Sequence, residues 1–283
     1  MITLSIIIAT IGRTVHLENL LKSLVKGLRD IDYEILIIDQ NGDDRLDPIV
    51  NEFSDRLSID HHKVNFKGLS KAKNYGAQHA KGMYMTFPDD DCEVQNNTFK
   101  IALETIARTG ASIVFGKCTD FENQDSILKF KKEEYWLSIK NMDGGFVESS
   151  TIVESKIFQD YLFDERMGAG SFYGAEEGYD WLYRILKDNR FTAFFNPEII
   201  FFHPQALQQK GDETSLKRVY TYTCGHAFLC KKHKFYKKYF KAIIKSLIGI
   251  IIYFVTKPKY SKYYRVQLYA LLIGYEFANT NDY

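Results

Sequence analysis

Apolar residues in the first 115 positions follow two alternating patterns: short continuous runs, and longer stretches in which they recur every three or four residues. Continuous runs at residues 4–9, 33–39 and 83–87 predict strands that are buried on both faces of a sheet. Between the first two runs, a leucine repeat predicts a helix with one apolar face. The leucines of that face are Leu17, Leu20, Leu21, Leu24 and Leu28.

The same alternation continues along the chain. Helical patterns occupy residues 69–79, 98–107 and 176–186, and apolar runs predict strands at 111–115, 191–195 and 199–203. Strands that alternate with helices predict an α/β fold with a parallel, doubly wound sheet. Ligands of such sheets bind beyond the carboxyl ends of the strands. Asp39 and the run Asp89-Asp90-Asp91 stand at two such ends, so they are the first candidate site residues.

Three consecutive carboxylates after a buried strand repel one another, and they need a cation or water to stay ionised. Oxygen ligands of this kind suit Mg²⁺ or Mn²⁺, whose coordination is usually completed by substrate phosphates. Acidic residues also cap helices and favour the helix dipole in the first turn. Taken alone, residues 89–91 therefore leave a metal site and a helix cap equally open.

Composition narrows the class of protein. The 283 residues suggest one large domain, or one domain with an appendage, and 45% hydrophobic with 26% charged residues is ordinary for a folded chain. The net charge of +1 provides no overall field that attracts nucleic acid, so we expect no nucleic-acid partner. Irregularly spaced cysteines, with no secretory signal before the first strand, predict reduced thiols in a cytoplasmic protein.

Four segments match the motifs of one enzyme family in the expected order. Residues 5–13 (SIIIATIGR) and 34–42 (EILIIDQNG) match its two nucleotide-binding loops. Residues 68–76 (GLSKAKNYG), with Ala-Lys-Gly at 80–82, match its Gly-x-x-x-Ala-Arg-Asn-x-Gly segment, and Phe-Pro-Asp-Asp-Asp at 87–91 matches its Asp-x-Asp metal motif. Over residues 4–92 the chain thus resembles glycosyltransferase family 2, inverting enzymes that use nucleotide sugars.

The resemblance implies a GT-A fold, with a Rossmann-like, mostly parallel sheet flanked by helices. It implies that Asp39 contacts the nucleobase and that Asp91 binds a divalent cation, Mn²⁺ or Mg²⁺, which bridges the donor's diphosphate. Lys73 stands where the family usually has arginine, and lysine supplies the charge without the bidentate fork. The implied nucleotide-binding residues are Ala9, Thr10, Arg13, Asp39, Lys73, Asp89 and Asp90, and the implied metal ligands are Asp91, Asp89 and His203.

The resemblance extends to a second acidic cluster and to the histidine at residue 203. Residues 168–184 (GAGSFYGAEEGYDWLYR) resemble the acceptor-side motif, in which a carboxylate at a helix start is the general base. The family's Glu-Asp-x-Asp pattern has no unique register here, and we favour Glu177 as the base, followed by Glu176 and Asp180. A helix-start cluster of acids without catalytic role is the alternative. Asn-Pro-Glu at 196–198, followed by His203, matches the family's Asn-Pro…His pattern.

The composition shifts to lysine, tyrosine and isoleucine from about residue 216. The apolar runs 246–256 and 266–277 fall short of the ~18–20 residues that a spanning helix needs, and basic residues flank them. This pattern favours interfacial membrane attachment, with packing on the catalytic domain or on a second subunit of a homo-oligomer as the alternative. Cys224, His226, Cys230 and His233 have the residue types of a zinc site, but their spacing fits no common finger.

We therefore expect a catalytic domain over residues 1–215, with a nucleotide-sugar-binding half at 1–115 and an acceptor-binding half at 116–215, followed by an amphipathic helical region at 216–283. The expected function is the transfer of a hexose or N-acetylhexosamine from a UDP-sugar to a saccharide or lipid-linked saccharide, in bacterial-type surface polysaccharide synthesis at the inner face of the membrane. The alternatives are a catalytically silent scaffold and a nucleotidyltransferase. The turn at 10–13 is too poor in glycine for the phosphate loop that a nucleotidyltransferase usually carries.

Overall fold

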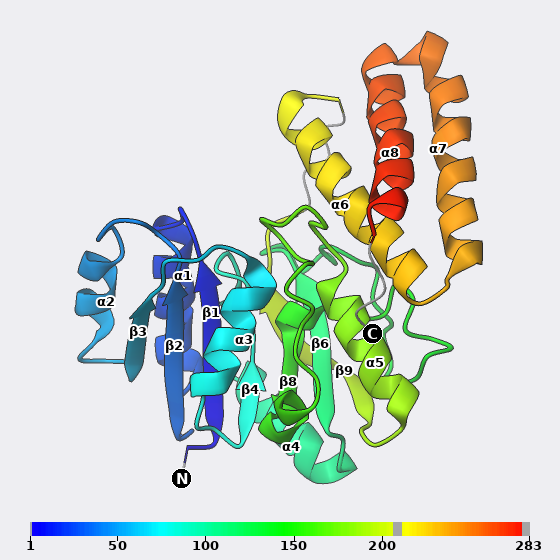
Figure 1. Ribbon diagram of the computed structural model, residues 1–283. Helices are drawn as coiled ribbons and strands as arrows, with labels where there is room; N and C mark the ends of the chain where they lie inside the picture. The colour runs from blue at the N-terminus through cyan, green and yellow to red at the C-terminus, as the bar shows by residue number, and fades with distance from the viewer. Residues whose placement is uncertain (1, 206–210, 279–283) are drawn as a thin grey trace. The chain divides into compact units, whose positions relative to one another are not determined.

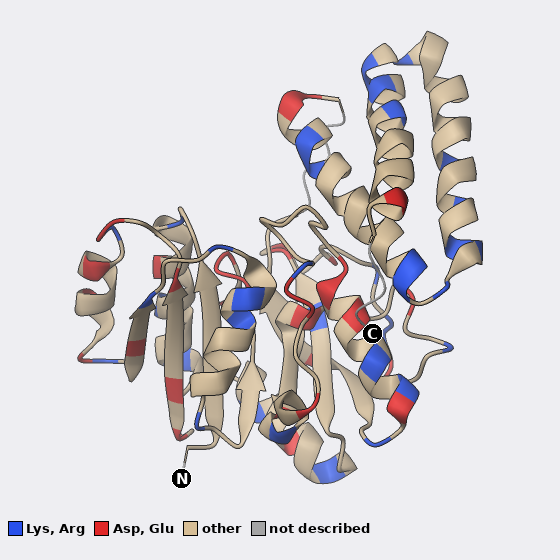
Figure 2. Ribbon diagram, in the orientation of Figure 1, with Lys and Arg blue, Asp and Glu red and all other residues tan. Residues whose placement is uncertain are grey.

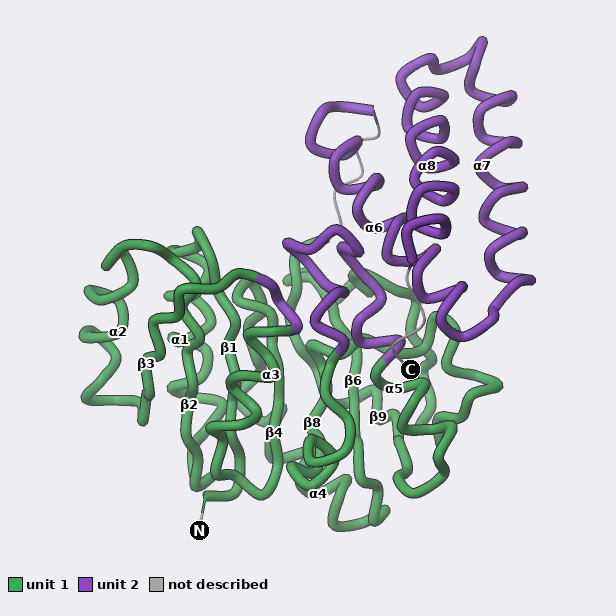
Figure 3. The backbone as a smooth tube through the Cα atoms, in the orientation of Figure 1, with its two compact units in different colours: residues 1–67, 71–163, 181–206 green, residues 68–70, 164–180, 207–283 purple. Residues whose placement is uncertain are grey.

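The computed structural model describes residues 2–205 and 211–278 (Figure 1). Contacts between Cα atoms divide the chain into two compact units (Figure 3). The first unit comprises residues 1–67, 71–163 and 181–206, and the second comprises 68–70, 164–180 and 207–283. Residue 215, where we expect the catalytic domain to end, and residues 164–180 of its expected acceptor-binding half lie in the second unit. The functional division into these domains stays a prediction.

The first unit is built on a sheet whose strands follow the order β3-β2-β1-β4-β8-β6-β9-β5, with β7 paired to β9. Within the described residues, β1, β2, β3, β4, β6 and β9 run in one direction, and β8, β5 and β7 run in the other. The mostly parallel sheet is therefore confirmed. The strands are β1 Leu4–Thr10, β2 Tyr33–Asp39, β3 Ile59–Lys63, β4 Tyr84–Thr86, β5 Glu93–Val94, β6 Ile113–Thr119, β7 Tyr135–Leu137, β8 Thr151–Glu154 and β9 Ala193–Phe202.

Helices cover both faces of this sheet because alternate residues of β1 point to opposite sides. On one face, Leu4, Ile6 and Ile8 share a buried cluster with the leucines of α1 (Val15–Gly27) and with the apolar residues of α4 (Thr98–Thr109). On the other face, α3 (Leu69–His79) approaches so closely that a Cβ on Gly76 would lie 2.3 Å from Cγ2 of Ile7. The remaining helices of this unit are α2 Asp47–Phe53, the 3₁₀ helices Glu148–Ser150 and Ser155–Gln159, and most of α5 Glu177–Asp188.

One strand replaces the two that were predicted at 191–195 and 199–203. β9 is continuous, and its pairing with β6 shifts register between Phe115 and Lys117. The residue at the shift is Gly116, where a Cβ would lie 1.8 Å from the carbonyl oxygen of Ile199. A β-bulge next to a glycine therefore carries the strand past Pro197.

The second unit contains the helices α6 Glu213–Lys232, α7 Tyr236–Thr256 and α8 Pro258–Glu276. A glycine allows α8 to pack closely on α6, because a Cβ on Gly274 of α8 would lie 2.6 Å from Cα of Cys224 in α6. The expectation that no apolar run is long enough to span a membrane is wrong for α7, which has 21 residues and contains 18 consecutive residues with a mean hydropathy of 1.7. Its lysine-bearing start and its apolar end form one helix, so by length and composition alone it could cross a bilayer.

Candidate functional site

The first unit brings together the three residues expected to bind a metal. Asp89 and Asp91 follow β4, and His203 follows β9, so all three leave the carboxyl ends of strands that run in the same direction. One ligand atom from each lies within 4.8 Å of the other two. Nε2 of His203 is 3.6 Å from Oδ1 of Asp91 and 3.9 Å from Oδ2 of Asp89. Two carboxylates and an imidazole thus converge on one point.

Asp91 supplies the observation that favours a cation at this point. Its Oδ1 is buried and has no hydrogen-bond partner among the described residues. Burying a carboxylate oxygen without a hydrogen-bond partner costs free energy, because no protein group replaces the hydrogen bonds that it made to water. A divalent cation would satisfy that oxygen, and the oxygen and nitrogen donors present fit such an ion.

Asp90 differs from its two neighbours because protein groups already hold it. It accepts a hydrogen bond from Oγ1 of Thr10 at 2.7 Å and another from Nη1 of Arg13 at 2.6 Å. Burial raises the pKa of Asp90 above its usual value, although these two contacts oppose the rise. The same Nη1 lies 2.6 Å from Oδ2 of Asp91. Asp90 therefore fixes Thr10 and Arg13 at the edge of the candidate metal site.

Asp39 lies at the end of β2, next to Ala9 and Thr10 at the end of β1. Its side chain is fully buried, and Oδ1 accepts hydrogen bonds from the backbone N and Nδ2 of Asn41, at 2.8 and 2.7 Å. Oδ2 is 3.0 Å from Nε2 of His61 on β3. Oδ1 of Asn41 in turn accepts from the backbone N of Gly12 at 2.7 Å. The two loops expected to bind the nucleotide are thereby tied to each other.

Lys73 on α3 belongs to the same cluster. Its side chain is 1% exposed, and its Nζ lies 4.0 Å from Oδ1 of Asp89 and forms an ion pair with Glu148. A buried ammonium is stable only when it is paired, and Glu148 provides the opposite charge beside it. The lysine that replaces the family's arginine thus stands beside the candidate metal ligands.

The three candidate bases lie in the second unit and in different surroundings. Glu176 has a positive φ of 73°, and its Oε1 is 2.7 Å from Nδ1 of His226. Asp180 is fully buried, and its Oδ1 lies 2.7 Å from Nζ of Lys232 and 2.7 Å from Nε2 of His233. Glu177 opens α5 and is 9% exposed. Two of the three acids are therefore held by imidazole or ammonium groups at or beside α6.

The model of the family described as "Glycosyl transferase family 2" matches residues 5–158, which is more than half of the chain. The chain belongs to glycosyl transferase family 2. This membership confirms the resemblance and the expectation of a transferase, and it favours glycosyl transfer over the nucleotidyltransferase alternative.

Two curated relatives of this family 2 glycosyltransferase extend the comparison. It is 24% identical over 275 residues to a Campylobacter jejuni GalNAc(5)-diNAcBac-PP-undecaprenol beta-1,3-glucosyltransferase, in an alignment that covers 86% of this chain and 88% of that protein. It is 26% identical over 165 residues to the Escherichia coli UDP-Glc:alpha-D-GlcNAc-diphosphoundecaprenol beta-1,3-glucosyltransferase WfgD, over 57% of this chain and 61% of that protein. The chain therefore spans most of the first relative and less than two thirds of the second.

Solved structures confirm the GT-A fold. Staphylococcus aureus TarS has a TM-score of 0.61 at 16% identity, over 78% of this chain and 39% of the TarS chain. The mannosyltransferase PcManGT of Pyrobaculum calidifontis, solved with GDP-Man and Mn²⁺, has a TM-score of 0.55 at 13% identity, over 96% of this chain and 72% of that chain. At these identities the likeness concerns the fold alone.

Sequence reasoning missed two residues of this glycosyltransferase's candidate site. His61 stands on β3, whose five residues Ile-Asp-His-His-Lys carry no apolar run. Glu148 begins a three-residue 3₁₀ helix in a stretch without helical or strand periodicity. The structure identifies His61 as a site residue by its contact with the buried Asp39, and Glu148 by its ion pair with the buried Lys73.

The zinc alternative gains no support from the described residues. The Sγ of Cys224 is 3.5 Å from the carbonyl oxygen of Ala270, and Nε2 of His233 bonds to Asp180. All four cysteines are unpaired and buried, as expected for reduced thiols. Among residues 2–205 and 211–278, the group formed by Asp89, Asp91 and His203 is the one that could hold a metal ion.

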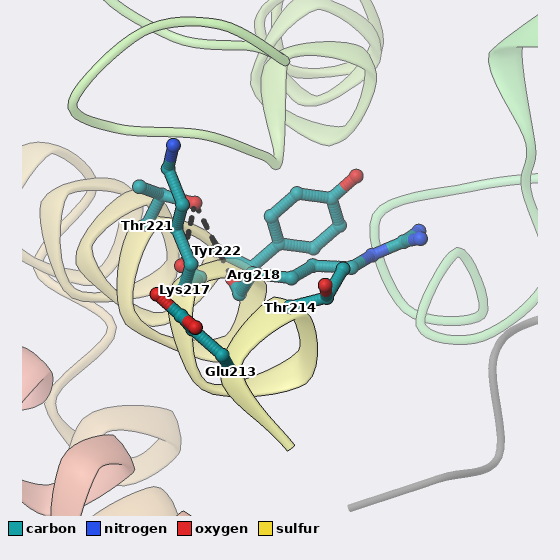
Figure 4. Close-up of a pocket in the computed structure, with 6 residues that line it drawn as sticks. All are labelled: Glu213, Thr214, Lys217, Arg218, Thr221 and Tyr222. Atoms are coloured by element: carbon teal, nitrogen blue, oxygen red, sulfur yellow. Dashed lines mark hydrogen bonds between the residues drawn. The ribbon is translucent and has the colours of Figure 1, made fainter. Parts of the chain in front are cut away.

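A surface hollow also occurs on α6, but its lining carries no site chemistry. It contains one carboxylate, that of Glu213, and Oγ1 of Thr221 bonds back to the carbonyl oxygens of Lys217 and Arg218 (Figure 4). A single carboxylate beside two cations provides neither a metal site nor a general base. The lining residues are Glu213, Thr214, Lys217, Arg218, Thr221 and Tyr222.

Gly168 should be required for the position of Glu177. A Cβ at Gly168 would lie 2.9 Å from Oγ of Ser70 and 3.3 Å from Cδ of Glu177, whereas a Cβ at Gly170 would meet nothing within 4 Å. Both glycines have positive φ, 104° and 88°, so alanine strains the backbone at either position by about 1–2 kcal/mol. We expect Gly168→Ala to lower kcat about tenfold further than Gly170→Ala does, because it displaces Glu177, the candidate base, and small misplacements of reacting groups are costly. Steady-state assays of both variants measure this difference, and equal kcat values would contradict it.

Proposed function

We propose that the protein transfers a hexose or N-acetylhexosamine, with inversion, from a UDP-sugar to a hydroxyl of a lipid-linked saccharide in bacterial-type surface polysaccharide synthesis. The observation that carries this proposal is the convergence of Asp89, Asp91 and His203, with Oδ1 of Asp91 buried and lacking a hydrogen-bond partner among the described residues. Convergent oxygens of this kind suit a cation that is shared with a substrate phosphate.

Two relatives and one solved structure support the choice of a UDP-sugar and a lipid-linked acceptor. The name of WfgD specifies UDP-Glc, and its name and that of the Campylobacter relative specify acceptors on undecaprenol diphosphate. TarS has been solved in complex with UDP-GlcNAc. In this chain the buried carboxylate of Asp39 can accept a hydrogen bond. Uracil can donate that bond from the N–H group that lies between the two carbonyls of its ring.

The residues around the metal group would bind the donor's diphosphate. Asp89, Asp91 and His203 would hold Mn²⁺ or Mg²⁺, and Arg13 and Lys73 add positive charge beside them. The bound cation would neutralise the charge that develops on the departing nucleoside diphosphate. Arg13, whose side chain is 44% exposed, can reorient toward a phosphate, whereas Lys73 is fixed by Glu148.

We assign the general base to Glu177, because it opens α5 within the acidic segment 168–184 that resembles the family's acceptor-side motif, in which a carboxylate at a helix start is the base. Glu177 would accept the proton of the acceptor hydroxyl while that oxygen bonds to the anomeric carbon. The bond from that carbon to the diphosphate oxygen breaks in the same displacement, so the configuration inverts.

A transfer assay tests the proposal. Purified protein with Mn²⁺ should move labelled sugar from UDP-Glc, UDP-Gal or UDP-GlcNAc to an undecaprenyl-diphosphate-linked saccharide, and NMR of the product should show a β linkage from an α-linked donor. GDP-Man is the control donor. Transfer from GDP-Man alone would overturn the choice of donor. Nucleotide binding without transfer to any acceptor would favour the scaffold alternative.

We further propose that the protein attaches peripherally to the inner face of the membrane through α7. One side of α7 packs on α8: a Cβ on Gly249 would lie 2.5 Å from the ring of Tyr264, and Ser246 bonds to Gln267. The other side is apolar and exposed, at 74% for Ile251 and 84% for Val255. Basic residues gather at the starts of α7 and α8 (Figure 2). Anionic headgroups complement such a flanking charge.

The pairing of α7 with α8 argues for a helix that lies in the interface and against one that spans the bilayer. α8 carries Lys262 and Arg265 near its start, so a hairpin that crossed the membrane would draw both charges into hydrocarbon. An in-plane hairpin leaves them among the headgroups while Ile251 and Val255 enter the apolar layer.

The double variant Ile251→Asp/Val255→Asp should therefore lose membrane binding. We expect its binding to vesicles of phosphatidylglycerol and phosphatidylethanolamine to fall at least about tenfold, since two exposed aliphatic side chains contribute about 1.5–3 kcal/mol each when buried. Vesicle flotation at low and high salt measures this. Val15→Asp on α1, where the valine is 63% exposed, is the matched control and should bind as the unaltered protein does. Undiminished flotation of the double variant would exclude α7 as the attachment site.

A further inference from the structure

The segment that carries Glu177 is held by the C-terminal helices of the second unit. Residues 164–180 cluster with residues 207–283 (Figure 3). The contact is close at the backbone, because the amide N of Gly174 donates to the carbonyl oxygen of Thr221 at 2.9 Å. A Cβ on Gly225 of α6 would lie 2.6 Å from the carbonyl oxygen of Ala175. The backbone just before Glu176 therefore lies directly against α6.

We infer that α6 is part of the catalytic apparatus: His226 and His233 are positioning residues that fix the two acids on either side of Glu177 and thereby aim its carboxylate at the acceptor hydroxyl. This inference rests on the proposed function, in which Glu177 is the general base. The region matched by the family model ends at residue 158, before α6 begins at Glu213.

The contact at Glu176 holds a strained residue. A φ of 73° is uncommon for a residue with a side chain, and it persists only where surrounding contacts impose it. Nδ1 of His226 bonds to Oε1 of Glu176 at 2.7 Å, and Nε2 of the same ring is 3.6 Å from Sγ of Cys230. Burial disfavours a charged imidazole, but the bonds to Cys230 and Glu176 outweigh it and raise the pKa of His226 to about 10. The imidazole of His226 is thus protonated at neutral pH and faces the carboxyl group of Glu176.

The contact at Asp180 is buried and more extensive. The side chains of Asp180, Lys232 and Asp164 are 0%, 4% and 9% exposed. Oδ1 of Asp180 lies 2.7 Å from Nζ of Lys232 and 2.7 Å from Nε2 of His233. The same Nζ of Lys232 lies 2.8 Å from Oδ2 of Asp164. Lys232, in the last turn of α6, therefore links Asp164 in the loop before the acidic segment to Asp180 in the first turn of α5. His233, which caps α6, makes a second contact to Asp180. Glu177 lies between the two anchored acids.

The two histidines use different ring nitrogens, which permits a selective rescue. Asparagine can place its amide N–H₂ near the position of Nδ1, and glutamine can place its own near Nε2. We expect His226→Leu and His233→Leu to lower kcat about 10²-fold, since misplacement of a reacting group by about 1 Å costs that much. His226→Asn and His233→Gln should stay within about tenfold of the unaltered protein, because they keep the bonds to Glu176 and Asp180. In all four variants KM for the UDP-sugar and the Kd of UDP should change less than about twofold.

The experiment measures kcat, KM and UDP affinity for these four variants together with Glu177→Gln, and uses His16→Leu on the exposed face of α1 as the control. A kcat loss in the two leucine variants, with recovery in His226→Asn and His233→Gln, supports the inference. Leucine variants that keep full kcat would overturn it. Equal losses in the leucine and amide variants would overturn it as well. Full activity of Glu177→Gln would instead refute the assignment of the base, which separates the two failures.

Discussion

Replacement of Asp91 by asparagine is expected to lower glycosyl transfer by about 10²–10³-fold, the loss typical when a group that stabilises developing charge is removed. Asp91 contributes the buried Oδ1 that no described residue bonds, while its Oδ2 lies 2.6 Å from Arg13. The amide removes the negative charge that a cation requires, yet it keeps the shape of the side chain. The folded structure should therefore survive, and activity should not.

Initial rates over a range of Mn²⁺ concentrations check this expectation. Asp91→Asn should need much more metal for any residual rate, because only Asp89 and His203 of the group remain intact. Asp55→Asn, on the exposed surface after α2, removes the same charge elsewhere and should leave the rate unchanged. A variant at residue 91 that kept its rate and its metal dependence would show that this carboxylate does not bind the cation.

Replacement of Glu177 by glutamine should have a comparable effect for a different reason. A positioned general base contributes about 10²–10⁴-fold, and glutamine cannot accept the acceptor's proton. Because the base acts on the acceptor, UDP should bind to the variant with unchanged affinity. Glu176→Gln should lose less than Glu177→Gln does, since Glu176 serves as an anchor to His226.

Single-turnover assays compare the glutamine variants under identical donor saturation. The pattern expected is a large loss at residue 177, a smaller one at 176 and equal UDP affinity in both. If Glu176→Gln proved the more damaging of the two, the roles of base and anchor would have to be exchanged. Circular dichroism of each variant shows whether the fold is retained.

The half of the fold that binds the nucleotide could be predicted because its strands are buried on both faces. All seven residues of β1 are buried, so the strand is visible as an apolar run, and α1 shows its leucine repeat. Asp39 and Asp89–Asp91 were found because parallel strands bring their carboxyl ends to one edge of the sheet. Topology alone thus located the acidic residues of the candidate site.

Short polar strands and tertiary pairings could not be predicted in this way. β3 is only partly buried and has polar residues at four of its five positions, and β8 is four residues long within an irregular stretch. Such strands are stabilised by the neighbours with which they pair, and the sequence around them does not show these neighbours. His61 and Glu148 could not be predicted as site residues for the same reason. Each is identified by its contact with a buried charged side chain, Asp39 or Lys73, and the sequence does not show these contacts.

The C-terminal helices illustrate a different limit. Lysines at the start of α7 divided its sequence into a basic part and an apolar part, and the apolar part alone was too short to span a membrane. In the structure both parts form one helix because lysine is a good helix former and its charge remains in solvent. The links from the α6 region to Glu176 and Asp180 were likewise hidden, because they join residues about fifty positions apart.

Isothermal titration of UDP into the unaltered protein, with Mn²⁺ and then with EDTA, tests the central claim most directly. We expect UDP to bind with Mn²⁺ and to bind at least about tenfold more weakly when the metal is chelated, because Asp89, Asp91 and His203 would hold a cation that offsets the charge of the diphosphate. GDP should bind more weakly than UDP under both conditions. Equal UDP affinity with Mn²⁺ and with EDTA, or no binding of UDP in either, would contradict a metal-dependent donor site at these three residues.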